Sequence, residues 1–201
     1  MQVIGLTGGM AAGKSTVASL FRQAHIPVFD ADAVVRKLQG PRGRAFPFIA
    51  QHFPKAVKNN QLDRTVLREE VLSRPEALGI LEKIIHPLVR QERELFLRRC
   101  RARGKRECVL DIPLLMEINA DQECDWVVVV EAPYSTRLAR IRQRGKGNVR
   151  MSEKQAQGFL KRQMSDEERR RRADFVIKTG LSKANTVKQV ARFLHHIREI
   201  A

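Results

Sequence analysis

The chain has 201 residues, of which 43% are hydrophobic and 30% charged, so it can bury a substantial core and is not wholly disordered. Its 38 lysines and arginines exceed its 22 acidic residues, and the net charge of +16 points to anionic partners such as nucleic acid, acidic membranes or phosphorylated small molecules. No apolar stretch approaches the roughly 20 residues of a membrane span, and three cysteines without a CxxC pair argue against a secreted disulfide framework.

Short apolar strands alternate with amphipathic helices along the chain, which is typical of a parallel α/β domain. The expected strands are Val3–Thr7, Pro27–Phe29, Glu107–Leu110, Trp126–Val130 and Phe175–Ile177. The β-branched run that ends at Val130 fits a central strand buried on both faces. Helices are expected over residues 14–24, 134–144 and 184–200. The apolar stripe of the last helix would consist of Val187, Val190, Ala191, Leu194 and Ile197.

The middle of the chain is predicted to be an inserted, largely helical subdomain. Prolines and glycines between Gly40 and Asn60 favour loops with short helical turns. Helices are then expected over residues 64–72, 75–85 and 88–103. Asp63 would cap the first of them, and Pro87 would separate the last two because it lacks the amide hydrogen that a helix interior needs. Further on, two capping boxes, Ser152 with Gln155 and Ser165 with Glu168, predict two consecutive helices.

The segment Gly8–Ser15 matches the phosphate-loop pattern G-x-x-x-x-G-K-[ST] and lies between a predicted strand and a predicted helix. Small residues let successive backbone amides point into one concavity, where they bind phosphate oxygens. The helix after Gly13 adds the partial positive charge of its N-terminus at the same place. Lys14 can reach the β- and γ-phosphates, and the Ser15 hydroxyl can ligate Mg²⁺. The sequence therefore predicts a nucleotide-binding loop.

Three aspartates follow predicted strands, where open parallel sheets present residues to a ligand. Asp30 and Asp32 are one residue apart, so an extended segment would place both on the same side. One of them would cap the helix that begins near Ala33, and we assign to Asp32 the role of accepting or orienting the proton of an attacking hydroxyl. Asp111 would lie near the Mg²⁺ or have a purely structural role.

Several motifs, distributed over nearly the whole chain, together resemble the dephospho-CoA kinase family. They are Ile4–Gly9 with Gly13–Thr16, Phe29–Asp32, Leu62–Arg64, Leu81–Pro87, Asp111–Glu117, Arg140 with Arg144, Gln163, and Ala173–Ile177. The resemblance implies ATP-dependent phosphorylation of the ribose 3′-hydroxyl of dephospho-CoA, which gives coenzyme A and ADP in the final step of coenzyme A synthesis.

The resemblance also implies a P-loop kinase fold, with a five-stranded parallel sheet flanked by helices. The core would comprise residues 1–39 and 105–201, the helical CoA-binding insertion about 40–104, and a small arginine-bearing lid about 145–172. Asp32 and Lys14 would be catalytic, and Ser15 would bind the metal. The nucleotide would contact Gly8, Gly9, Ala11, Ala12, Gly13, Lys14, Ser15, Thr16, Arg140 and Arg144. The acceptor substrate would contact Asp32, Arg64, His86, Arg90, Leu114 and Glu117.

Two positions depart from the pattern of the family. Ala11-Ala12 stands where the family usually has Gly-Ser, and alanine lacks the conformational freedom of glycine. Thr179 lies in the segment after Ile177 where an asparagine is usual. These departures put the loop geometry and the contacts near the adenine end in question.

Two other functions compete with this one. A shikimate or nucleoside kinase would share the loop and the D-x-D motif, but not the helical insert and Pro113–Leu115. A basic nucleic-acid-binding protein would explain the charge, although aromatic residues make up only 5% of the chain and offer few stacking platforms. We expect ATP with Mg²⁺ and dephospho-CoA as ligands, neither nucleic acid nor membrane as a partner, a monomer or weak oligomer, and a cytoplasmic location.

Overall fold

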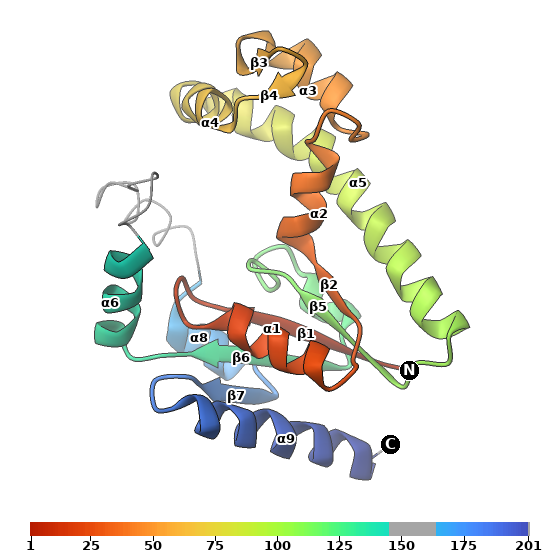
Figure 1. Ribbon diagram of the computed structural model, residues 1–201, viewed down its shortest axis with the longest axis vertical. Coiled ribbons are helices and arrows are strands. Elements are labelled where there is room, and N and C mark those ends of the chain that lie inside the picture. The colour runs from red at the N-terminus through yellow and green to blue at the C-terminus, as the bar shows by residue number, and fades with distance from the viewer. Residues whose placement is uncertain (145–163, 201) are drawn as a thin grey trace. The chain divides into compact units, whose positions relative to one another are not determined.

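The computed structural model describes residues 1–144 and 164–200 (Figure 1). The predicted helix that starts at Ser152 lies outside the described residues. The chain divides into two compact units, one formed by Met1–Phe29 with Gly104–Ala201 and the other by Asp30–Arg103. The first helix after Asp30, which we assigned to the core, thus belongs to the second unit. None of the helices in the described ranges is long and apolar enough to cross a membrane.

The first unit is built on a five-stranded sheet, and its described strand pairings are parallel, as predicted. The strand order is β2-β5-β1-β6-β7. Their bounds are β1 Gln2–Gly8, β2 Val28–Asp30, β5 Glu107–Asp111, β6 Trp126–Glu131 and β7 Phe175–Lys178. The middle position belongs to β1, so the valine-rich β6 is an interior strand but not the central one.

In the described ranges, four α-helices of this unit lie between or after its strands: α1 Lys14–Gln23, α6 Tyr134–Arg144, α8 Asp166–Arg171 and α9 Lys183–Ile200. The capping box at Ser165 is confirmed, since its side chain accepts a hydrogen bond from the Glu168 amide. The stripe predicted for α9 is partly wrong, because Val187 is 43% exposed and Ala191 is exposed. Phe193 is buried instead and packs against Phe21 and Phe175. The buried face of the helix is therefore the one that carries its largest apolar side chain.

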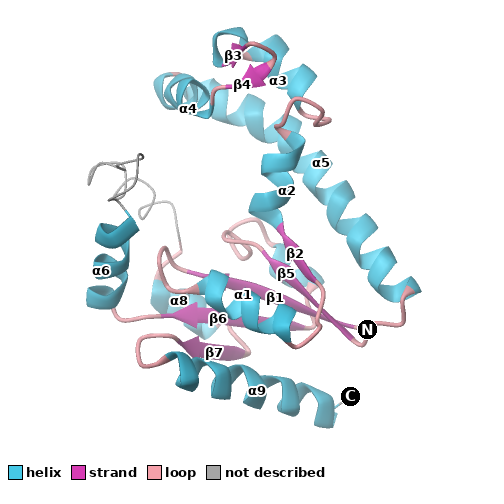
Figure 2. Cartoon of the chain, in the orientation of Figure 1, coloured by secondary structure: helices cyan, strands magenta, loops and turns pink. Residues whose placement is uncertain are grey.

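The second unit is almost entirely helical, with only the two short strands β3 and β4 (Figure 2). Its elements are α2 Ala31–Leu38, α3 Phe46–His52, the 3-10 turn Pro54–Ala56, β3 Val57–Lys58, β4 Gln61–Leu62, α4 Arg64–Ser73 and α5 Pro75–Ala102. Asp63 caps α4 as predicted, by accepting hydrogen bonds from the Thr65 and Val66 amides. The hairpin β3–β4 was not predicted, although its Asn59-Asn60 turn with two positive φ angles is a known hairpin signal.

The two helices expected on either side of Pro87 form the single helix α5, so that prediction is wrong. Proline removes one backbone hydrogen bond and crowds the preceding turn. Apolar side chains on both sides of it, including Ile84, Ile85, Leu88 and Val89, pack into one core with α2, α3 and α4. The burial of these side chains keeps the two halves of α5 in one continuous helix and outweighs the helix-breaking preference of Pro87. The helix ends as predicted just before Gly104, which has φ of +62°.

Candidate functional site

The loop between β1 and α1 takes a tight turn that depends on glycine at its two ends. A Cβ atom at Gly8 would lie 2.5 Å from the carbonyl oxygen of Val130 on the neighbouring strand. Gly13 caps α1 with φ of +98°, and its carbonyl accepts the amides of Thr16 and Val17. Between them, Ala11 has φ of +59°. Sequence reasoning therefore identified the loop pattern and the departure from glycine at Ala11, but it did not predict the positive φ angle of that residue.

Three side chains hold this loop by its carbonyl groups. Arg137 Nε donates to the Met10 carbonyl at 2.8 Å, and Arg140 Nη1 donates to that of Ala11 at 3.1 Å. The Thr179 hydroxyl donates to the carbonyl of Ala12. Because the N–H and C=O of a trans peptide point in opposite directions, carbonyls held on one side leave the following amides directed to the other. The Ala12 amide donates to the Gly9 carbonyl at 3.0 Å, so the amides of Ala11 and Gly13 are the ones suited to an anion.

Lys14 and Asp111 meet beside the loop. The ammonium of Lys14, the first residue of α1, forms an ion pair with the Asp111 carboxylate at the end of β5. Both side chains are largely buried, with 18% and 7% of their surface exposed. The carboxylate thus holds the lysine at the mouth of the loop, a contact that the sequence did not specify. Ser15 and Thr16 are exposed on the first turn of α1.

A cavity of about 400 Å³ adjoins the loop in the first unit. It is lined by Gly9, Ala12, Val130, Glu131, Ala132, Pro133, Arg137, Asp166, Arg170, Lys178, Gly180 and Leu181. Arg170 and Glu131 form an ion pair at 2.9 Å, and their hydrogen bond raises the pKa of the arginine. A Cβ at Gly180 would lie 2.3 Å from the Pro133 ring, so glycine is needed there. The apolar surfaces of Pro133 and Leu181 could flank a flat ring.

The arginines expected near the nucleotide and in the lid differ in what they contact and in whether the structure describes them. Arg140 lies on the outer side of the loop, where it binds the carbonyl of Ala11 and both the hydroxyl and the carbonyl of Thr179. Arg137, which we did not single out for the site, is 9% exposed and pairs with Asp166 at 2.6 Å. The side chain of Arg144 and residues 145–163 of the expected lid lie outside the described residues.

Asp30 and Asp32 have distinct positions in the structure, and the extended arrangement expected for them is wrong. Asp30 accepts a hydrogen bond from the Ala33 amide at 2.8 Å and caps α2. This cap starts the helix at Ala31, so Asp32 belongs to the first helical turn and is exposed. The positive end of the helix favours the charged carboxylate at this position.

Arg64, the first residue of α4, contacts α2. Its Nη2 donates to the carbonyl of Arg36 at 3.4 Å, and Arg36 lies one helical turn after Asp32. A cavity of about 570 Å³ borders this region, lined by Gln39, Gly40, Pro41, Gln61, Leu62, Asp63 and Arg64. The second unit therefore connects Arg64 to the helix that carries Asp32.

The other expected substrate residues are divided between the two units. His86 and Arg90 are exposed one turn apart on α5 in the second unit. Leu114 is 40% exposed in the first unit. There too, Glu117 accepts the Met164 amide at 3.0 Å, and its other carboxylate oxygen is buried without a partner among the residues described.

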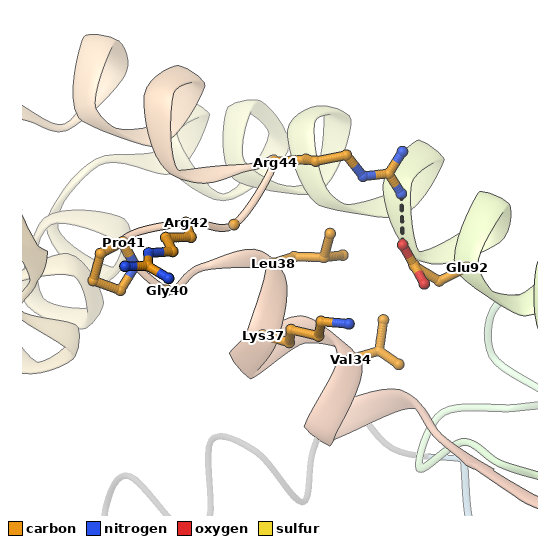
Figure 3. A pocket seen from close by; sticks show the side chains of 9 residues that line it. Val34, Lys37, Leu38, Gly40, Pro41, Arg42, Arg44 and Glu92 are labelled. Carbon is orange, nitrogen blue, oxygen red and sulfur yellow. Dashed lines mark hydrogen bonds and ion pairs between the residues drawn. The ribbon is translucent and has the colours of Figure 1, made fainter.

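A further cavity, of about 580 Å³, lies beside α2 (Figure 3). It is lined by Val34, Lys37, Leu38, Gly40, Pro41, Arg42, Gly43, Arg44 and Glu92. Arg44 pairs with Glu92 of α5 at 2.8 Å, whereas Lys37 and Arg42 have no ion-pair partner within the described ranges. Nothing in the sequence pattern pointed to this cavity.

Comparisons with known proteins agree with one another. Residues 2–184 match the family model described as dephospho-CoA kinase. A curated dephospho-CoA kinase of Gluconobacter oxydans is 65% identical over 99% of both chains, and one of Bartonella henselae is 45% identical over 94% of this chain and 95% of its own.

Solved structures give the same result. The protein TT1252 of Thermus thermophilus superimposes with a TM-score of 0.84 at 31% identity, covering 97% of this chain and 96% of that one. A dephospho-CoA kinase of Campylobacter jejuni gives 0.66 at 26% identity, covering 98% of this chain and 97% of its own. A shikimate kinase of Aquifex aeolicus gives 0.51 at 20% identity over 98% of both chains, a likeness of fold alone.

Proposed function

The chain belongs to the dephospho-CoA kinase family, and we propose that Asp32 and the loop Gly8–Ser15 carry out the reaction of that family. The protein catalyses the ATP-dependent phosphorylation of dephospho-CoA, which yields coenzyme A. In the proposed reaction the ribose 3′-oxygen of dephospho-CoA attacks the γ-phosphorus of ATP. The bond from the γ-phosphorus to the β,γ-bridging oxygen breaks, ADP leaves, and the hydroxyl proton passes to a carboxylate.

The loop binds the triphosphate of ATP in this proposal. The amides of Ala11 and Gly13, which follow the anchored carbonyls of Met10 and Ala12, donate to phosphate oxygens. The Lys14 ammonium, held at the mouth of the loop by Asp111, neutralises charge on the β- and γ-phosphates. The adjoining cavity beside Pro133 and Leu181 accommodates the adenine ring.

Mg²⁺ fits a site of this kind, in which the protein supplies few ligands. The described residues contain no cluster of three or more histidine, cysteine, aspartate or glutamate side chains. Mg²⁺ in kinases keeps several waters and binds mainly phosphate oxygens, so the exposed Ser15 hydroxyl is a sufficient protein contribution. The ion, when bound, neutralises phosphate charge.

Asp32 is the proposed proton acceptor. Its carboxylate is exposed at the start of α2, so it is accessible to a hydroxyl group. Arg64, which contacts the helix that carries Asp32, supplies a positive charge for the phosphates of the acceptor substrate. His86, Arg90, Leu114 and Glu117 complete the proposed substrate contacts, and Arg140 and Arg144 those near the nucleotide.

The loop conformation, with three consecutive carbonyls anchored on one side, is the observation that carries this proposal. A test measures ADP release with dephospho-CoA, shikimate or nucleosides as the acceptor, and locates the new phosphate by ³¹P NMR. We expect turnover with dephospho-CoA and a phosphate on its 3′-oxygen. Phosphate at another position would refute the proposed attack, and turnover of shikimate or a nucleoside alone would assign the site to another small-molecule kinase.

A further inference from the structure

We propose that Thr179 is a positioning residue for ATP, because it holds the phosphate-binding loop in the conformation that Ala11 by itself resists. Thr179 follows β7 and is 168 residues from Ala11 in the chain, yet both belong to the first unit. The inference rests on the proposed function only in taking ATP as the ligand of the loop.

Ala11 has a backbone conformation that disfavours its side chain. Its φ of +59° lies in the left-handed region, where the Cβ atom of an L-residue crowds the backbone. The other non-glycine residues with positive φ in the described ranges are His25, Asn59, Asn60 and Asn119. Asparagine tolerates this region because its side chain can bond to nearby backbone, whereas alanine has no polar group to do so. A strained residue of this kind persists only where its surroundings hold it.

Thr179 and Arg140 supply that support at the two carbonyls that follow the strained φ torsion of Ala11. The Thr179 hydroxyl donates to the carbonyl of Ala12, and Arg140 Nη1 donates to that of Ala11 at 3.1 Å. The same Arg140 nitrogen donates to the Thr179 hydroxyl at 3.1 Å, and Nη2 donates to the Thr179 carbonyl at 2.8 Å. One threonine therefore both contacts the loop and orients the arginine that contacts it.

The position of Thr179 is itself determined by the sheet. Its amide donates to the carbonyl of Glu131, the last residue of β6, at 2.8 Å. Only 7% of its surface is exposed, so water competes little for the hydroxyl. Gly13 leaves room for it, because a Cβ at that position would lie 2.9 Å from the Thr179 hydroxyl oxygen. Thr179 therefore links the end of β6 to the loop, because its amide bonds to β6 and its hydroxyl bonds to the loop.

The test is direct ATP binding, measured by calorimetry without any acceptor substrate. Thr179→Val keeps the shape but removes the donor, and leaves the buried Ala12 carbonyl unsatisfied. We expect the Kd for ATP to rise about tenfold. Thr179→Ser keeps the hydroxyl and should stay within about twofold of the parent protein. Thr186→Val is the matched control, because Thr186 is also buried but its hydroxyl donates to the carbonyl of Ser182, the residue before α9.

A double-mutant cycle separates support of Ala11 from general stability. Glycine adopts the left-handed conformation freely, so in an Ala11→Gly background the loop needs the threonine less. We expect the effect of Thr179→Val on the Kd for ATP to fall below about threefold there. Unchanged ATP binding by Thr179→Val, or an equal effect in both backgrounds, would overturn the proposal.

Two further readouts keep the result interpretable. If Thr179→Val does not fold, Thr179→Ala and Thr179→Ser are compared in its place, and equal ATP binding by these two contradicts the inference. The KM for dephospho-CoA should not change in any Thr179 variant, which a general loss of structure would not predict. A parent protein that binds ATP but does not phosphorylate dephospho-CoA would refute the proposed function and leave the role of Thr179 intact.

Discussion

At the scale of the residue, Asp30 and Asp32 have different roles, although only one residue separates them. Asp30 is committed to the backbone of α2, where it accepts a hydrogen bond from the Ala33 amide, and Asp32 projects from the first turn of the helix into solvent. A cap needs only an acceptor oxygen, which asparagine also supplies. A general base needs a group that takes up a proton, which asparagine cannot do. The same substitution at the two positions therefore distinguishes the two roles.

We expect Asp32→Asn to lower kcat by about 10²–10⁴-fold, because it removes the proton acceptor while keeping the size of the side chain. The Kd for ATP should change by less than about twofold, since the substitution leaves the phosphate loop untouched. The matched variant Asp30→Asn keeps the cap of α2 and should retain kcat within a few-fold. Steady-state kinetics and ATP calorimetry measure both. A near-normal kcat for Asp32→Asn would remove that residue from the role of base.

The sequence predicts local features of the site and misses the contacts made across the fold. The spacing from Gly8 to Ser15 is a contiguous pattern, whereas the alanine at a position where glycine is usual put the loop geometry in question without predicting the positive φ of Ala11. The three anchors of the loop come from α6 and from the end of β7, and no local pattern records which carbonyl an arginine or threonine will reach. The ion pair between Lys14 and Asp111 depends likewise on the parallel pairing of β1 with β5.

At the scale of the element, local preference and tertiary packing disagree most clearly in α5. Pro87 is a helix breaker by its own chemistry, yet the helix continues from Pro75 to Ala102. The five strands of the parallel sheet and the helix caps at Asp63 and Ser165 were predictable, since each depends on a few adjacent residues. The continuity of α5 was not, because it depends on a core shared with α2, α3 and α4.

Replacement of Pro87 by alanine should stabilise the second unit by about 1–3 kcal/mol, because it restores the backbone donor within α5 and removes the ring clash. The proline adjoins His86 and lies three residues before Arg90, so a straighter helix should raise the KM for dephospho-CoA several-fold and leave the KM for ATP unchanged. Thermal unfolding and steady-state kinetics test these effects. If both KM values stay at the parent level while stability rises, the geometry at Pro87 has no part in binding the acceptor.

A second change in α5 tests helix propensity alone. Gly79 has open space around the position of an added Cβ atom, with no atom within 4 Å. Gly79→Ala should therefore increase the free energy of unfolding by about 0.5–1 kcal/mol. Gly5→Ala is the contrasting variant, since its Cβ would lie 2.6 Å from Leu115 and 2.8 Å from Cys124 in the packed core. That variant should lose about 1–3 kcal/mol. Denaturant titration measures both, and a destabilised Gly79→Ala would contradict the open space at this helix position.

At the scale of the whole molecule, the dominant feature is the net charge of +16. Both substrates are polyanions, and a positive field raises their local concentration and the rate at which they associate. A basic nucleic-acid-binding protein would carry a similar excess, so charge by itself does not separate the two functions. The two functions differ in what salt should change. Screening weakens long-range attraction of a substrate, but it does not alter a phosphoryl transfer that takes place after binding.

We expect kcat/KM for both ATP and dephospho-CoA to fall several-fold as NaCl is raised from about 50 mM to about 500 mM, because the Debye length then shortens to a few ångströms. The kcat at saturating substrate should change by less than about twofold. Potassium glutamate in place of NaCl controls for binding of chloride to the loop, since an effect of ionic strength alone is the same for both salts. A kcat/KM independent of salt would show that the charge excess does not act on the substrates. Tight DNA or RNA binding with a steep salt slope would then assign the excess to nucleic acid, because phosphates along a polymer release many counterions at once.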